Sequence, residues 1–190
     1  DQHIVDLENV FRDLLKANFM ISLPKFQTFE KTVLFLGHIV NGETITIPEE
    51  RKCYFDSLKP PKTKKELQSL LGLANYMANH LDSYQLKAGP LFDCIKNKDD
   101  KVTFELDEIQ MKSFLELKNA VKEAKSIHLM DFNKTLYVEC DASISGTGSV
   151  LYQAVGVTSK GGEMRNIIRF GSKRYTLPET LNMTSLDLSL

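Results

Sequence analysis

The sequence has few of the features that mark secreted, membrane or metal-binding proteins. It contains no apolar run near the length of about 18 residues that a membrane helix requires. Its first residues do not resemble a secretory signal peptide, because no basic cluster there leads into an apolar stretch. We therefore expect an intracellular protein that does not contact membranes.

Cysteines and excess charge are also scarce. Cys53, Cys94 and Cys140 are far apart and show no C-x-x-C spacing, which argues against a disulfide framework or a zinc site. Lys and Arg together number 24 against 25 Asp and Glu. The chain as a whole thus has no positive excess to hold a polyanion, and any contact with nucleic acid must come from local basic patches.

The residues that are present indicate an ordinary globular chain of mixed α+β class. Hydrophobic residues make up 42% of the 190 positions, enough for a packed core in one or two domains. Helical and strand periodicities both occur. We predict helices over residues 4–18, 48–59, 64–81, 86–96, 107–126 and from 178 onward, a β ribbon over 20–47, and strands over 135–140, 148–155 and 165–171.

Local signals support several of these elements. Asn41-Gly42, followed by alternating Thr and Ile, predicts a hairpin turn. Thr63 with Glu66, and Asp107 with Gln110, have the spacing of helix capping boxes. In the helix after Thr63, the apolar side chains recur with the helical period and should form one core face. We also expect Tyr76 to be a core residue.

The stretch from Leu136 to Tyr152 is the strongest functional signal. A strand ends in Asp141, and the small residues that follow allow a phosphate or a metal to approach closely. The simpler alternative is that Asp141 helps to cap backbone N–H groups around Ser143 and Gly146. An actin-like or sugar-kinase-type ATPase shares this layout but needs a second phosphate loop, which we do not find.

Several strings, in order, resemble the Pol polyprotein of gypsy-type retroelements. The thumb helix of that family, K-E-L-R-S-F-L-G-L-x-N-Y, resembles residues 65–76, and its T-D-A-S-x-x-G-x-G-A-V-L-x-Q resembles residues 140–153. His3–Phe11 resembles the helix that follows the family's polymerase site. Lys25 and Phe35–His38 resemble its primer-holding hairpin, although Phe26 stands at the usual Cys. Pro90-Leu91 resembles the P-L that follows the thumb helix, and Phe170–Lys173 resembles Y-x-S-R.

The resemblance implies a fold and a domain order. Residues 1–47 would be the end of a reverse transcriptase palm with its hairpin, and 48–97 a small helical thumb-like bundle. Residues 98–190 would be the connection and an incomplete RNase H-like α/β domain. We expect a fragment that begins and ends inside a fold, from a parent that is an RNA-directed DNA polymerase with ribonuclease H in a cytoplasmic particle or the nucleus.

For catalysis, the resemblance implies two Mg²⁺ or Mn²⁺ ions held by about four carboxylates in the intact parent. Asp141 matches the first of these metal ligands. The family's second carboxylate falls where this chain has Ser189, and Asp187 is a weaker substitute. No polymerase Y-x-D-D motif occurs, so we expect the fragment to be inactive alone and to bind no metal.

For binding, the resemblance implies a primer–template duplex or RNA/DNA hybrid as partner, beside the rest of the polyprotein. The candidate contacts are Lys25, Gly37, His38, Lys59, Lys62, Lys64 and Lys65. A basic cluster beside Pro-Pro is also typical of a plain solvated loop. His38 and His80 lack metal-ligand spacing, so we expect ordinary surface or hairpin roles for them. A decayed copy that only binds nucleic acid or another protein stays an alternative.

Overall fold

The computed structural model describes residues 2–96, 104–157 and 162–175. The chain divides into two compact units, with the boundary in the sequence between Val33 and Leu34. The predicted helix from Pro178 lies outside the described residues, as does Asp187.

The first unit consists of a helix and the segment after it, residues 17–33, which turns back along the helix and is called the returning segment. The helix α1 spans Gln2–Lys16, close to the prediction, and none of its side chains is buried. A short 3₁₀ turn, η1, covers Leu23–Lys25. The aromatic side chains of the returning segment pack on the helix, with ring centroids 5.3 Å apart for His3 and Phe29 and 5.4 Å apart for Phe11 and Phe26.

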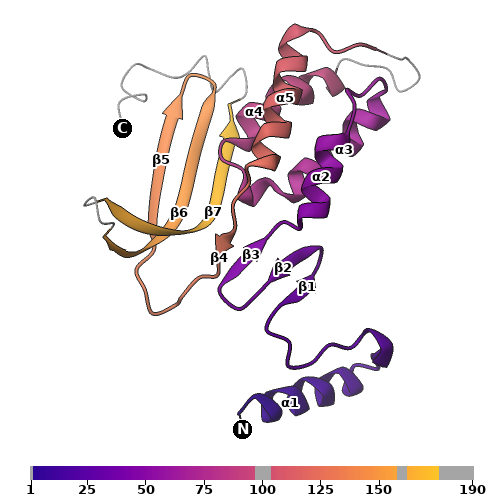
Figure 1. Ribbon diagram of the computed structural model, residues 1–190, viewed down its shortest axis with the longest axis vertical. Helices are drawn as coiled ribbons and strands as arrows, with labels where there is room; N and C mark the ends of the chain where they lie inside the picture. Colours follow the sequence, from indigo (N-terminus) through magenta and orange to yellow (C-terminus); the bar gives the residue numbers. More distant parts are fainter. Residues whose placement is uncertain (1, 97–103, 158–161, 176–190) are drawn as a thin grey trace. The chain divides into compact units, whose positions relative to one another are not determined.

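The core of the second unit is helical (Figure 1). Its buried side chains come mainly from four helices, so that α5 shares one core with the three helices that precede it. The helices are α2 (Glu49–Ser57), α3 (Lys64–Tyr76), α4 (Tyr84–Lys96) and α5 (Glu108–Lys122), with a 3₁₀ turn η2 (Ala78–His80) after α3.

Both predicted helix starts are confirmed. The Thr63 side chain accepts a hydrogen bond from the Glu66 backbone, whereas the Glu66 carboxylate reaches Lys62 N instead of Thr63 N. At α5, Asp107 and Gln110 form the complete reciprocal box. Since the first N–H groups of a helix lack intrahelical partners, these side chains fix where α3 and α5 begin.

A small sheet precedes the helices in the chain. Its strands are β1 (Val33–Phe35), β2 (His38–Val40) and β3 (Thr44–Thr46), joined by the two-residue strand β4 (Ile127–His128) that follows α5. The Asn41 turn is confirmed, since the Asn41 side chain accepts from the backbone of Glu43 and Thr44. The β ribbon was predicted too long: residues 20–32 contain no strand, because a 3₁₀ turn and irregular chain follow α1 there.

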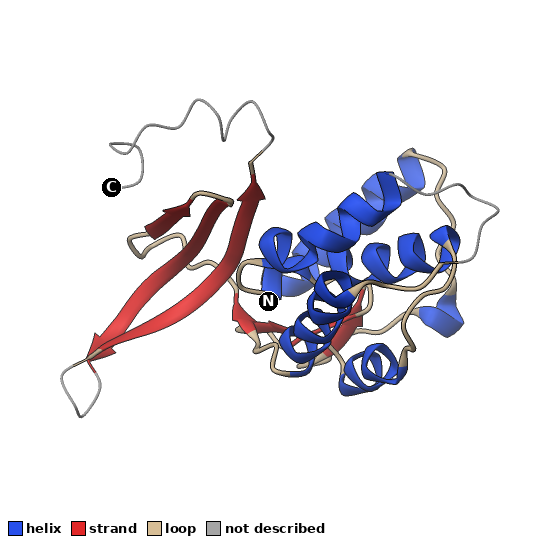
Figure 2. Ribbon diagram, turned by 90° about the horizontal axis from the view of Figure 1, so that it is seen from above, coloured by secondary structure: helices blue, strands red, loops and turns tan. Residues whose placement is uncertain are grey.

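A separate antiparallel sheet contains β5 (Tyr137–Ser143), β6 (Gly146–Val157) and β7 (Glu163–Arg174), in that order. Its strands are longer than predicted, because the two-residue Ile144-Ser145 turn pairs Ser143 with Gly146 directly. In Figure 2, the hairpin of β6 and β7 extends away from the helices. At its other end β7 packs on α4, where Arg174 forms an ion pair of 2.6 Å with Asp93 and donates to the Gly89 carbonyl oxygen.

Candidate functional site

The hairpin of β1 and β2 has an exposed tip, which side chains of α2 and α3 contact. Leu36 and Gly37 form its turn with φ values of 46° and 76°, the positive values that two-residue hairpin turns need. A Cβ added to Gly37 would lie 2.6 Å from Arg51 Nη2 and 3.0 Å from the Tyr76 hydroxyl. The absence of a side chain at Gly37 therefore lets α2 and α3 approach the tip.

A column of rings follows Gly37. The His38 ring stacks on Tyr76 with centroids 4.6 Å apart, and on His80 with centroids 5.3 Å apart. Tyr76 and His38 also share a hydrogen bond of 2.8 Å through the hydroxyl and Nδ1. The prediction that Tyr76 is a core residue is wrong, since Tyr76 keeps 37% of its surface exposed because its ring turns toward the hairpin.

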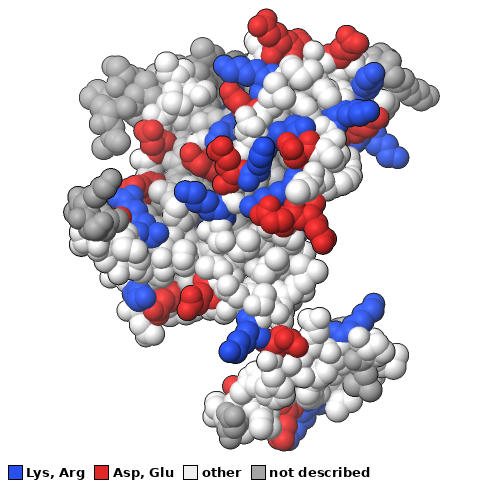
Figure 3. Space-filling model, viewed as in Figure 1, with Lys and Arg blue, Asp and Glu red and all other residues white. Residues whose placement is uncertain are grey.

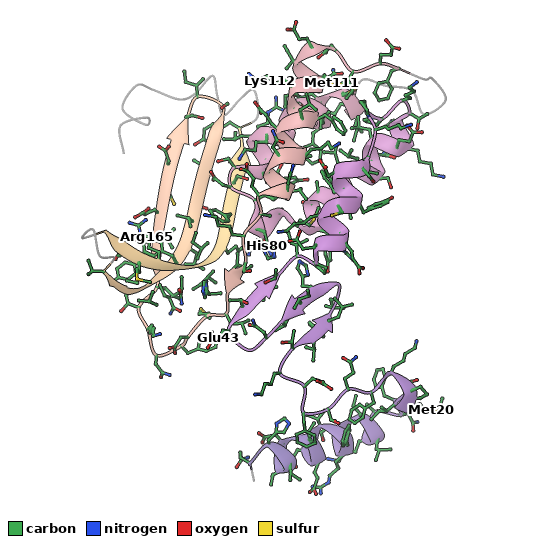
Figure 4. All side chains as sticks on the ribbon, viewed as in Figure 1. Met20, Glu43, His80, Met111, Lys112 and Arg165 are labelled. Atoms are coloured by element: carbon green, nitrogen blue, oxygen red, sulfur yellow. The ribbon has the colours of Figure 1, made fainter. Side chains whose placement is uncertain are left out.

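His80 closes this column inside the protein. It is 4% exposed, so the expected surface role is wrong for this residue. Its Nδ1 lies 3.1 Å from the carbonyl oxygen of Lys125. Figure 4 shows His80 where the helices meet the strands of the small sheet. The column thus joins the hairpin to the interior of the helical part.

Both histidines resist protonation. Burial lowers the pKa of His38, and the Arg51 guanidinium lowers it further. Burial is also the main cause that lowers the pKa of His80, with smaller contributions from His38 and Lys52, against a raising effect of the bond to Lys125. At neutral pH the stack therefore consists of neutral rings beside cationic side chains.

These shifts predict a pH dependence of stability. An unfolded histidine binds a proton at about pH 6.5, whereas the folded pKa values lie lower. The folded state therefore binds fewer protons, and the free energy of unfolding is expected to fall as the pH drops from about 7.5 to about 5.5. Urea unfolding at several pH values measures this slope. His80→Gln and His38→Gln should each flatten it, and an unchanged slope in both variants would contradict the assignment.

The predicted lysine cluster is located around the start of α3. Lys59, Lys62 and Lys65 are exposed, and Lys64 is half-buried. Lys59 and Lys62 line an open groove of about 600 Å³ beside Pro60 and Pro61. Lys25 is exposed in η1 of the other unit. In Figure 3, side chains of both charges are interspersed over the face in view.

Asp141 lies near the end of β5, exposed and paired in register with Gly148. It lines a hollow of about 590 Å³ that also includes Asp82, Ser83 and Glu139. The hydrogen bonds of the adjacent turn are made by the Ser143 hydroxyl, and Asp141 takes part in none of them. Asp82 was missed from the sequence, since it follows η2 and no local pattern connects it with β5.

Glu139 shares this side of the sheet but is committed to other partners. Its carboxylate accepts from the Tyr152 hydroxyl at 3.0 Å and forms an ion pair of 2.7 Å with Arg165. The Arg165 guanidinium lies over the Tyr152 ring at 4.3 Å. Hydrogen bonds from Arg165 and Tyr152 lower the pKa of the Glu139 carboxyl, so this group acts as a structural anion within the sheet.

The described residues do not by themselves fit a two-metal centre. No group of three His, Cys, Asp or Glu side chains within residues 2–96, 104–157 and 162–175 is close enough to hold a metal ion. Asp141 is the predicted ligand within these ranges. None of the described helices combines the length and apolar character needed to cross a bilayer.

Residues 106–189 match the family described as an RNase H-like domain found in reverse transcriptase. The chain is 29% identical, over 80% of its length, to the Pol polyprotein from transposon opus of Drosophila melanogaster. It is 30% identical, also over 80%, to that from transposon gypsy of the same fly. The chain spans 16% of each of these polyproteins.

A solved structure has the same arrangement of elements. The foamy viral protease-reverse transcriptase in complex with an RNA/DNA hybrid superposes with a TM-score of 0.76 at 26% identity, over 98% of this chain and 24% of that one. The described part of this chain contains helices and two antiparallel sheets, which confirms the predicted α+β class. Together with the ordered motifs, these matches show that the chain belongs to the Pol polyproteins of gypsy-type retroelements, as part of a reverse transcriptase with an RNase H-like domain.

Proposed function

We propose that this chain holds a primer–template duplex or RNA/DNA hybrid for the reverse transcriptase to which it belongs. The observation that carries the proposal is the lysine cluster around the start of α3, of which Lys59 and Lys62 line a groove next to Pro60 and Pro61. Ammonium groups and the first N–H groups of a helix both favour phosphate oxygens. The foamy viral relative in complex with an RNA/DNA hybrid supports this choice of ligand.

The hairpin tip provides a second contact in this proposal. Gly37 lets the side chains of α2 and α3 reach the tip, and neutral His38, whose Nδ1 is bonded to the Tyr76 hydroxyl, offers its Nε2 to the duplex, as an N–H donor where the partner is a phosphate. Lys25, which is exposed in the first unit, is proposed as a phosphate contact of that unit by itself. The three-part division into palm end, thumb-like bundle and RNase H-like domain belongs to the same proposal.

The test is a salt titration of binding. The 190-residue chain is mixed with a labelled hybrid of about 20 base pairs, and anisotropy is followed at increasing NaCl. Replacement of Lys59, Lys62, Lys64 and Lys65 by Gln should reduce the slope of log K against log [salt] by about 2 to 3 and weaken binding more than about tenfold at low salt.

The matched control removes the same charge elsewhere. Gln at Lys16, Lys112, Lys122 and Lys134 should change the slope much less, because these lysines lie outside the proposed groove. Asp141→Asn should bind as the wild type does. Failure of the wild-type chain to bind the hybrid at low salt would remove the proposal.

In the RNase H-like part, we propose that Asp141 is the first metal carboxylate of the parent enzyme and that the isolated chain does not cleave RNA. Metal ions, when bound in the complete parent, would activate the water that attacks the RNA strand. A cleavage assay with Mg²⁺ should show no product above background. Strong cleavage that Asp141→Asn abolishes would contradict this.

A second candidate is a non-catalytic binding module, in the nucleus or in a cytoplasmic particle. It is favoured by Ser189, which stands where the family's second carboxylate is expected. In that case Ser189→Glu, in a chain extended by the rest of the polyprotein, would restore no cleavage. Recovery of Mg²⁺-dependent cleavage would instead favour the enzymatic parent.

A further inference from the structure

Arg51 lies on α2, outside every string that resembles the retroelement family, yet its guanidinium reaches the hairpin tip. Its Nη2 occupies the space beside Gly37 that a side chain would fill. Its Cζ lies 4.7 Å from the centre of the Tyr76 ring. The guanidinium is thus fixed between a bare backbone and an aromatic face, a placement that favours a planar cation.

The charge of Arg51 has no counter-ion in the described ranges. Its neighbour Lys52 forms an ion pair of 2.9 Å with Glu49 and donates to the Ala124 carbonyl oxygen. Arg165 and Arg174 are likewise bound to carboxylates. No carboxylate of the described residues lies within ion-pair distance of Arg51, although this side chain is only half-exposed.

The Arg51 guanidinium contacts uncharged groups, Gly37 and the Tyr76 ring, and the acidic residues before it on α2, Glu49 and Glu50, form no ion pair with it. His38 and His80 are neutral rings, and protonation of either one would add another cation next to Arg51 and Lys52. A half-buried guanidinium among such neighbours is stabilised most by an external anion. Phosphate suits it well, because the planar fork can donate two parallel hydrogen bonds.

We propose that Arg51 binds a backbone phosphate of the duplex held at the hairpin tip, and that Tyr76, His38 and His80 position its guanidinium. This inference rests on the function proposed above. Tyr76 supports the flat face of the cation and leaves its edge free to donate. His38 holds Tyr76 through the shared hydrogen bond, and His80 anchors His38 from the interior.

The column of rings restricts the Arg51 side chain before a ligand binds. A surface arginine loses side-chain freedom when it binds, which weakens the contact. Here the stacked rings already restrict the Arg51 side chain, so it loses less conformational entropy on binding. More of the free energy of the phosphate contact then contributes to affinity. Tyr76→Leu should therefore weaken binding while it leaves the salt slope near that of the wild type, because the charge remains.

The decisive experiment compares Arg51→Gln with Arg51→Lys in the same hybrid titration. Gln should weaken binding about 3- to 10-fold at low salt and reduce the salt slope by about 1, the loss of one phosphate contact. Lys keeps the charge, so the slope should stay, while affinity falls about 2- to 3-fold because an ammonium lacks the fork. Arg169→Gln on β7 is the matched control and should change neither quantity appreciably.

The outcomes separate this inference from the proposed function. If the wild-type chain does not bind the hybrid, the proposed function fails. If it binds and Arg51→Gln matches it in affinity and slope, the inference fails alone. Thermal unfolding shows whether each variant is folded. If the Arg51→Gln variant does not fold, the Arg51→Lys variant provides the test. A folded Arg51→Lys variant whose slope of log K against log [salt] falls by about 1, although its charge is retained, would overturn the inference.

Discussion

Phe55→Ala is expected to lower the free energy of unfolding by about 3 to 5 kcal/mol. Phe55 is 0% exposed and is the one side chain of α2 that is buried. Removal of its ring leaves a cavity that the neighbouring helices cannot fill without moving. Polar bonds also attach α2 and the residue after it, such as those from Lys52 to the Ala124 carbonyl oxygen and from Lys118 to the Leu58 carbonyl oxygen.

Urea unfolding followed by circular dichroism measures this loss. Tyr54→Ala on the same helix is the matched control, because Tyr54 is 60% exposed and its truncation should cost less than about 0.5 kcal/mol. Since α2 also carries Arg51, the Phe55 variant should bind the hybrid more weakly. Equal losses of stability for the two aromatic residues would show that α2 is not anchored as described.

Gly146→Ala is expected to destabilise the protein by about 1 to 3 kcal/mol or more. A Cβ at this position would overlap the Lys173 carbonyl oxygen and lie 2.7 Å from Leu86 Cδ2. The carbonyl oxygen belongs to the backbone of β7 and cannot rotate away. The end of β7 must therefore shift, and with it the Arg174 ion pair that joins this sheet to α4.

The same substitution at Gly72 should have the opposite effect on the free energy of unfolding. Gly72 lies within α3 and is exposed, and nothing lies within 4 Å of a Cβ built there. Gly72→Ala should stabilise the protein by about 0.5 to 1 kcal/mol, because alanine is the better helix former. Thermal and urea unfolding of both variants provide the comparison. A stabilising Gly146→Ala would refute the close approach of β7.

Local signals in the sequence were sufficient for much of the fold. Thr63 and Asp107 cap helices because a side-chain oxygen and the first N–H groups are neighbours in the chain. Asn41-Gly42 makes its turn for a similarly local reason. The ordered motifs were sufficient for the family.

Contacts between distant residues could not be read in this way. The two-residue strand β4 pairs with β3 although α2 to α5 separate them in the chain, and two residues carry too little periodicity to predict a strand. Tyr76 lies away from the buried face of α3, and the stacking of its ring on His38, from another element, follows from no local pattern. Asp82 reaches the hollow of Asp141 only through the fold.

The amino-acid sequence alone determined most of the helices, the longer strands and the family, because these depend on neighbouring residues and on strings in order. Only the tertiary structure decided that Tyr76, His38 and His80 form one column of rings. It also decided that Arg51 lies beside Gly37 and over the Tyr76 ring. The reason is physical: ring stacking and the location of an unbalanced charge depend on distances between elements, and no local pattern of residue types encodes those distances.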